Sequence, residues 1–157
     1  MIDKINIWIE KTLKSYSSNA VSCEQFSSQF KDFYSTEFLE NSYFVVVDQL
    51  PKPDFPELRQ AGFGDFIDMD AAAITYKNTY FVKKGFEADL ELHFHELVHV
   101  VQWQNLGAPL FIARYMKEIS CVGYRNAPLE KMAYDLQATF SLKKSKLDVL
   151  SYVQSHI

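Results

Sequence analysis

The sequence predicts an α+β fold in which N-terminal and C-terminal helices flank a small twisted sheet and one central helix. Apolar residues recur with the 3.6-residue helical period near both ends of the chain. Short runs of β-branched and aromatic residues lie between positions 43 and 83. The length of 157 residues, with 48% hydrophobic and 15% aromatic residues, fits a single domain over residues 1–157 with a sizeable core.

Two helices are expected at the N-terminus. Asp3 is a candidate cap for the first, whose apolar stripe is Ile5, Trp8, Ile9 and Leu13. Ser22 and Gln25 resemble a capping box that opens the second. An aromatic stripe follows it at helical spacing, which is typical of core packing rather than of a cofactor site: Phe26, Phe30, Phe33 and Tyr34.

Three β-strands are predicted in the middle of the chain. The run Tyr43–Val47 is apolar enough for a buried strand, and the prolines between Leu50 and Pro56 indicate a loop. Ala73–Tyr76 and Thr79–Lys83 flank Lys77-Asn78, which predicts a hairpin in which Asn78 takes the left-handed backbone conformation.

Three helices are expected after the hairpin. Asp89 is a plausible N-cap for Leu90–Leu106, which should stop at Gly107. A second helix covers Leu110–Ser120, and a turn follows it. Asn126 and Pro128 then open a third helix, whose apolar side is Leu129, Met132, Ala133 and Leu136.

The charge balance disfavours nucleic-acid binding. The net charge is −4 and the pI is about 5.5, whereas phosphate binding requires a basic surface. The densest basic stretch is predicted to be a solvated helix face: Lys143, Lys144 and Lys146. Cys23 and Cys121 lie far apart without a C-x-x-C spacing, so we expect two buried thiols rather than a zinc knuckle or redox motif, with pairing in an oxidising compartment as the alternative.

No segment indicates export or membrane insertion. The first ten residues intersperse charges among apolar side chains, unlike a signal peptide. No apolar run approaches the roughly 20 residues that a membrane span needs. We therefore expect a soluble, cytoplasmic protein that does not bind a membrane, although export by a route without a classical signal stays open.

The strongest chemical signal is His95-Glu96-Leu97-Val98-His99, an H-E-x-x-H motif on the predicted helix Leu90–Leu106. Its histidines are one turn apart and project from the same face, so both imidazoles can bind one zinc ion. Glu96 lies about 100° around the helix from His95, where it can act as a general base without being a ligand. With four histidines in the chain, chance occurrence of the motif is rare.

A catalytic zinc ion takes three protein ligands, so a third must come from elsewhere in the chain. Two glutamates compete for this role. Glu118 lies 19 residues after His99, and Glu130 lies 31 residues after it. Each is on a predicted helix that could pack against the motif helix, so the spacing alone leaves both open.

The stretch from Ala73 to Tyr134 resembles small bacterial zincin-like metallopeptidases of the gluzincin type. The resemblance is carried by Thr79-Tyr80-Phe81-Val82, the segment His95–Gln102, Leu106-Gly107, Pro128-Leu129-Glu130 and Ala133-Tyr134. It implies a zincin-like layout, one Zn²⁺ per chain and Glu130 as the third ligand. One departure is Met132, where we expect Glu or Gln in such proteins.

Other polar residues lie near these motifs. Tyr134 lies four residues after Glu130, so its phenol shares that helix face and could stabilise an oxyanion or orient a ligand, with core packing as the alternative. Tyr124 and Arg125 are expected in a surface turn. His93 lies about 200° around the helix from His95 and should point away from the metal. Gln102 is expected to be structural.

These features predict a zinc-dependent hydrolase, and specifically a peptidase, that acts on a peptide or protein substrate with Glu96 and Tyr134 as catalytic residues. The predicted strand Thr79–Val82 is a candidate sheet edge for pairing with an extended peptide. Two alternatives stay open: a zincin-like binding module without catalysis, and a zinc hydrolase that cleaves a bond other than a peptide. The chain lacks G-x-S-x-G, P-loop and G-x-G-x-x-G motifs.

Overall fold

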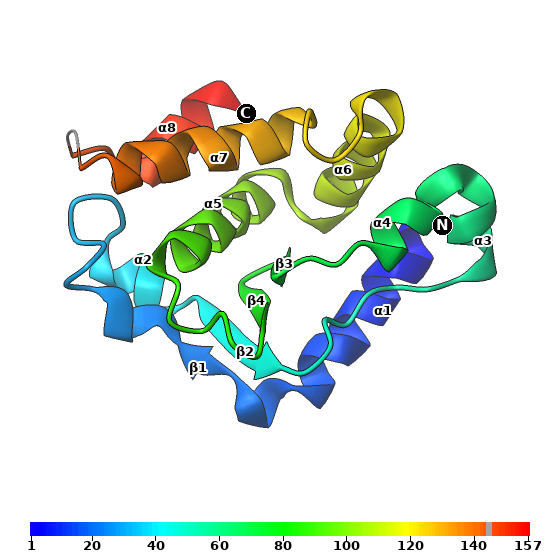
Figure 1. Cartoon of the computed structure of the whole chain (residues 1–157), viewed down its shortest axis with the longest axis horizontal. Coiled ribbons are helices and arrows are strands. Elements are labelled where there is room, and N and C mark those ends of the chain that lie inside the picture. Colours follow the sequence, from blue (N-terminus) through cyan, green and yellow to red (C-terminus); the bar gives the residue numbers. More distant parts are fainter. Residues whose placement is uncertain (144–145) are drawn as a thin grey trace.

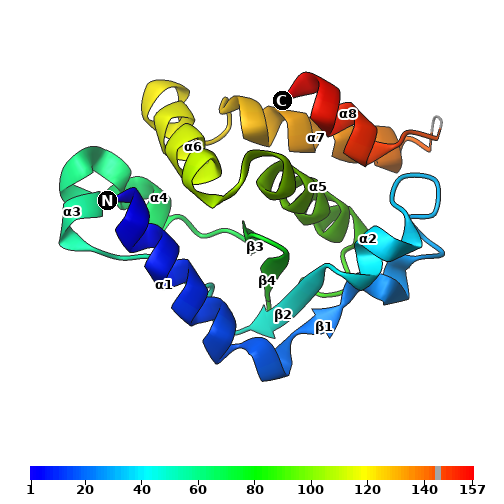
Figure 2. The ribbon, with the colours of Figure 1, turned by 180° about the vertical axis from the view of Figure 1, so that it is seen from behind.

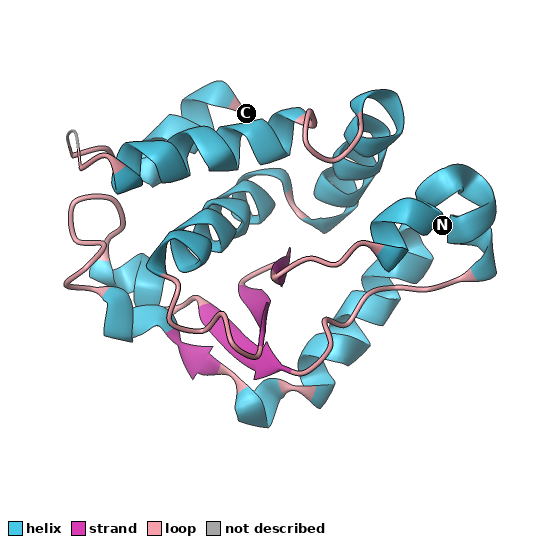
Figure 3. Ribbon diagram, viewed as in Figure 1, coloured by secondary structure: helices cyan, strands magenta, loops and turns pink. Residues whose placement is uncertain are grey.

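The computed structural model, which describes residues 1–143 and 146–157, is an α+β fold built from helices around a small mixed sheet (Figures 1 and 3). The longer helices are α1 (Ile2–Ser15), α5 (Leu90–Leu106), α6 (Ala108–Val122), α7 (Pro128–Ser141) and α8 (Val149–His156). Shorter helical segments are η1 (Ser17–Asn19), η2 (Cys23–Phe26), α2 (Thr36–Glu40), α3 (Pro56–Leu58), η3 (Arg59–Phe63) and α4 (Gly64–Asp68). The strands are β1 (Val21–Ser22), β2 (Tyr43–Val47), β3 (Ala73–Tyr76) and β4 (Thr79–Lys83).

The sheet has the strand order β1-β2-β4-β3. Strand β4 pairs in parallel with β2, with Val45 opposite Phe81, and antiparallel with β3, with Thr75 opposite Tyr80. The prediction that Thr79–Val82 forms a sheet edge is therefore wrong, because β2 occupies its second side. The edge next to α5 is β3, and this follows from a pairing between distant segments that no local pattern records.

Side chains of the sheet alternate between two faces, as strand geometry requires. On one face Phe44 and Tyr80 contact His93 of α5, at ring distances of 4.9 and 5.5 Å. On the opposite face Trp8 of α1 packs edge-on against Tyr76 at 5.4 Å. Helices α1 and α5 thus pack against opposite faces of the sheet (Figure 1).

Helix α5 is the centre of the domain and is buried without interruption from His93 to Trp103. Asp89 caps its start by accepting a hydrogen bond from the backbone N–H of Leu92, as predicted. Gly107 ends it with φ of 78°, a conformation that other residues adopt at a cost. Helices α7 and α8 cover the side of α5 away from the sheet (Figure 2).

The segment from Ser22 to Tyr34 differs from the predicted helix. Only η2 is helical there, and turns follow it. Ser22 caps η2 by accepting from the N–H of Glu24, so the expected capping box with Gln25 does not form. The aromatic stripe is nevertheless core, because Phe26, Phe30, Phe33 and Tyr34 are all buried. Turns bring these rings inward as effectively as a helix would.

Several other local predictions need correction. The first helix has Met1 at its N-cap, with Asp3 in its first turn. Lys77, rather than Asn78, has the positive φ in the hairpin turn. Ala127, rather than Asn126, is the N-cap of α7. Cys121 is exposed, whereas Cys23 is buried as expected.

Lys143 and Lys146 lie outside the helices, so the predicted lysine-rich helix face is not formed by these two residues. Helix α7 ends at Ser141, and Lys143 beyond it has φ of 51°. Lys146 is exposed and lies 3.7 Å from a carboxylate oxygen of Asp32, while Lys144 lies outside the described residues. Over residues 1–143 and 146–157, no helix combines the length and the apolar character that crossing a membrane requires.

Candidate metal centre

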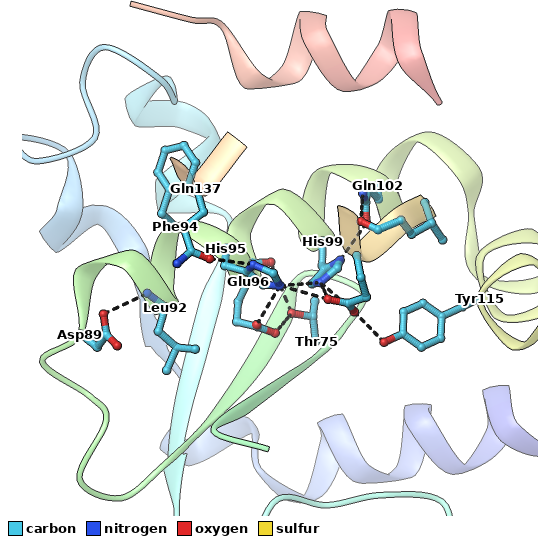
Figure 4. Close-up of polar contacts among 12 residues, drawn as sticks. Thr75, Asp89, Leu92, Phe94, His95, Glu96, His99, Gln102, Tyr115 and Gln137 are labelled. Carbon is cyan, nitrogen blue, oxygen red and sulfur yellow. Dashed lines mark hydrogen bonds and ion pairs between the residues drawn. The ribbon is translucent and has the colours of Figure 1, made fainter. Parts of the chain in front are cut away.

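Three side chains converge between α5 and α7. His95 and His99 project from one face of α5, and Glu130 comes from the first turn of α7 (Figure 4 shows the two histidines). The Nε2 atoms of the histidines are 3.2 Å apart, and each lies 3.2 Å from the Glu130 carboxylate. All three side chains are buried, with 5% or less of each residue exposed. These three residues form a buried cluster that could hold a metal ion.

The outer nitrogens of both imidazoles are held by glutamines. The Nε2 of Gln102 donates to the carbonyl of Leu129, so its Oε1 is free to accept from Nδ1 of His99 at 2.8 Å. Gln137 places its Oε1 3.0 Å from Nδ1 of His95. A neutral imidazole with its proton on Nδ1 presents a lone pair at Nε2. Both Nε2 lone pairs therefore face each other and a carboxylate, which is the donor set of a cation site.

The pKa shifts of His99 and Glu130 also indicate that the cluster is stabilised by a positive charge at its centre. Burial disfavours the protonated form of His99, yet the adjacent Glu130 carboxylate raises its pKa to about 9. Burial likewise opposes ionisation of Glu130, but His99 and His95 lower the pKa of this carboxyl well below its ordinary range. A proton on His99 thus substitutes for the cation when no metal is bound.

Glu130 is held by two features of its surroundings. Tyr115 of α6 donates its hydroxyl to Oε2 of Glu130 at 2.6 Å. Glu130 also lies in the first turn of α7, which begins at Pro128, and a helix N-terminus favours a carboxylate. Met132 places its sulfur 3.5 Å from Nε2 of Gln102. Tyr115 therefore supports the carboxylate of Glu130.

Glu118, the alternative third ligand, is not part of this cluster. One of its carboxylate oxygens accepts from the backbone N–H of Leu129 at 2.8 Å, and the other accepts from Nε of Arg114 at 2.9 Å. Glu118 therefore satisfies a free N–H at the start of α7, one residue before Glu130. The role of this glutamate is to position the helix that carries the ligand.

Glu96 lies beside the cluster without joining it. Its Oε1 accepts a hydrogen bond from the hydroxyl of Thr75 on β3 at 2.8 Å, and its Oε2 is 4.0 Å from Nε2 of His95 (Figure 4). The residue is 5% exposed. Thr75 fixes one oxygen of the carboxylate and leaves the other facing the site, which is the arrangement that a general base needs.

Two tyrosines border the cluster on its open side. The ring of Tyr134 lies 4.5 Å from the ring of His95, and the residue is 38% exposed. Tyr124, from the turn before α7, is half-buried rather than on the surface. Burial and the nearby Glu130 carboxylate raise the pKa of Tyr124 well above its ordinary value.

Two spaces meet at Glu96. An open, polar groove of about 630 Å³ is bordered by His95, Tyr134 and the Val122–Asn126 turn. An inner, apolar pocket of about 110 Å³ extends from His99 and Glu130 into the domain. Glu96 and Tyr124 line both spaces. A bound molecule can therefore reach the cluster from the groove and extend beyond it into the pocket.

His93 lies on the other side of α5, as the helical spacing predicts. It is fully buried, and its ring lies 4.4 Å from that of Phe26. Its Nε2 donates to the carbonyl of Glu87 at 2.9 Å, so its Nδ1 accepts from the hydroxyl of Tyr80 at 2.6 Å. His93 is thus a core residue with both nitrogens satisfied.

The sequence predictions did not include four residues of the site: Thr75, Tyr115, Gln137 and, as a partner of a ligand, Gln102. Gln102 follows His99 by three positions on the same helix, so helical spacing contained a signal for it. Thr75, Tyr115 and Gln137 belong to other elements, where no local pattern marks them.

Comparisons with protein-family models, with curated proteins and with solved structures find no match for this chain.

Proposed function

We propose that this protein is a zinc-dependent hydrolase that cleaves peptide bonds, with Glu96 as the general base. The observation that carries the proposal is the convergence of two imidazole lone pairs and one carboxylate beside a second, separately held carboxylate. Two histidines and a glutamate form a ligand set typical of catalytic zinc, which leaves a coordination position for water.

The chain's own residues suit the proton transfers of hydrolysis. Zinc, when bound by His95, His99 and Glu130, supplies a Lewis acid that lowers the pKa of water toward about 7. Glu96 is placed to accept a proton from the attacking water and to return it to the leaving amine. Tyr124 and Tyr134 border the open groove, where a phenol can donate to an oxyanion.

The arrangement of β3 supports a peptide substrate. Over the described residues, β3 is the sheet edge beside α5, and its Ala73 lines both the groove and the inner pocket. An extended peptide can pair with such an edge through its backbone, which would place a carbonyl near Glu96. This role replaces the one predicted for β4.

The first test is the metal content of the purified protein, measured by elemental analysis beside the His99→Ala variant. We expect about one zinc per chain in the wild type and none in the variant. A wild type that takes up no zinc, even when zinc is added, would contradict the proposal.

The second test is turnover of a peptide library by the zinc-loaded protein and its Glu96→Gln variant. We expect the variant to keep its zinc while its rate falls about 10²- to 10⁴-fold, because general-base catalysis contributes that much. Full activity in the variant would remove Glu96 from the mechanism. Zinc binding without peptide cleavage would favour a zincin-like binding module that lacks catalysis. Cleavage of ester or non-peptide amide substrates alone would favour a zinc hydrolase that acts on a bond other than a peptide bond.

A further inference from the structure

The inner pocket beside the metal cluster is lined mainly by apolar side chains, and this lining favours an apolar ligand. It lies inside the domain, because side chains from α1, α6 and the segment between them line it while less than a tenth exposed: Ile5, Ile9, Phe63, Phe111 and Ile112. His99 and Glu130 line the pocket on the side of the metal cluster, and Glu96 lines both the pocket and the groove. A pocket with these walls gains most by excluding water from an apolar group.

Lys52 lines the wall of the pocket, and its ammonium group is already hydrogen-bonded within the protein. Its ammonium group donates to the carbonyls of Phe66, Ile67 and Met69, at 3.1, 3.2 and 2.6 Å. An ammonium has three protons, so these bonds use all of them. Burial also lowers the pKa of Lys52. Lys52 therefore fastens the end of α4 over the pocket and offers no proton to a ligand carboxylate.

The geometry points to a substrate that carries an uncharged apolar group next to the bond that is cleaved, with that group buried in the inner pocket. The polar remainder of the substrate occupies the open groove. This inference rests on the proposed function, and it adds a substrate class to it. The apolar group is either an amino-acid side chain or an acyl chain, since both present the same chemistry to the pocket.

The test uses hydroxamic acids, which bind zinc through one end and carry a variable group at the other. Binding of acetohydroxamic acid to the zinc-loaded protein is compared with binding of the butyl, hexyl and octyl homologues, by calorimetry. Each methylene that enters the pocket should tighten binding by up to about fourfold. A parallel series, in which Ala, Leu or Phe adjoins the hydroxamate, distinguishes a side chain from an acyl chain.

Two matched variants show where the apolar group binds. Ile119 lines the pocket from α6 and is partly buried, so Ile119→Trp should fill the space. Leu110 lies on the same helix, is 55% exposed and does not line the pocket, so Leu110→Trp is the control. We expect Ile119→Trp to abolish the chain-length effect, while acetohydroxamic acid still binds and shows that the site is folded.

The outcomes separate this inference from the proposed function. Binding of acetohydroxamic acid without any gain from longer chains, or with the same gain in both variants, would overturn the pocket assignment and leave the metal site intact. A protein that binds neither zinc nor acetohydroxamic acid would overturn the proposed function and this inference together. For a readout that does not need zinc, benzene should raise the melting temperature of the metal-free wild type but not of Ile119→Trp.

Discussion

Two buried polar clusters lie on opposite sides of helix α5. They differ in whether the protein's own donors and acceptors satisfy every hydrogen bond. On the core side, Cys23, Tyr80 and His93 form a chain that ends on the carbonyl of Glu87. Burial raises the pKa of the Cys23 thiol to about 12, so it stays protonated and can donate to the oxygen of Tyr80. Every donor in this cluster has an acceptor, and nothing further is needed to complete it.

On the other side, when both imidazoles are neutral, His95, His99 and Glu130 direct acceptor atoms at one another. Their outer atoms are fixed by Gln102, Gln137 and Tyr115, so rotation cannot relieve the arrangement. The comparison teaches that burial of a histidine on a helix does not identify a ligand. The informative property is whether the cluster is complete without a cation.

The largest expected effect separates the two sides directly. His99→Ala should lower zinc affinity by more than about 100-fold, because it removes a ligand rather than a partner of one. His93→Gln should leave zinc affinity within about twofold while lowering the unfolding free energy of the metal-free protein. Zinc titration and urea unfolding of both variants measure the affinity and the unfolding free energy. Loss of zinc from His93→Gln would contradict the separation of α5 into a metal-binding side and a core side.

The partner of a ligand should give the next largest effect. Gln102→Leu keeps the volume of a fully buried side chain but removes the acceptor of His99, so zinc affinity should fall about 10- to 100-fold. Competition with a fluorescent chelator measures the affinity. Gln104→Leu, an exposed glutamine on the same helix, is the control and should change it by less than about twofold. An unchanged affinity in Gln102→Leu would show that Gln102 does not orient His99.

On the core side, Tyr80→Phe should destabilise the protein by about 1–3 kcal/mol, because it leaves Nδ1 of His93 without its donor in a buried place. Zinc stoichiometry should not change. Thermal unfolding with and without zinc tests both statements. A variant as stable as the wild type would show that this hydrogen-bond chain contributes little to folding.

A further expected effect is a pH dependence of opposite sign on the two sides in metal-free protein. The pKa of His99 is raised from 6.5 to about 9, so its stabilisation is complete below pH 6.5 and is lost as pH rises toward 9. Burial lowers the pKa of His93, so its contribution is lost as pH falls below 6.5. Urea unfolding in a chelator between pH 5.5 and 9 measures both limbs.

Variants assign each limb of this pH profile. His99→Gln should flatten the alkaline limb, and His93→Gln should flatten the acidic limb. Saturating zinc should also remove the alkaline limb, because metal binding requires the neutral imidazole. An alkaline limb that persists in His99→Gln would assign it to another group.

Local signals accounted for the elements whose pattern is strong. The strand Tyr43–Val47, the hairpin and the helix Leu90–Leu106 follow their predicted boundaries closely. The segment Ser22–Tyr34 did not, because aromatic residues at helical spacing are compatible with a series of turns that buries the same rings. The short helices α3 and α4 were not predicted, since a run of prolines precedes them and their apolar pattern is too short to detect.

The sequence by itself determined the pair of histidines and the position of Glu96, because all three lie within one helical turn and helix geometry fixes their relation. It left Glu118 and Glu130 as equal candidates by spacing, since packing between helices is not encoded in a single helix. Tertiary structure decided between them by using Glu118 to hold the start of α7 and Tyr115 to hold Glu130. It also made β3 the edge strand, because β4 pairs with a segment more than thirty residues earlier in the chain.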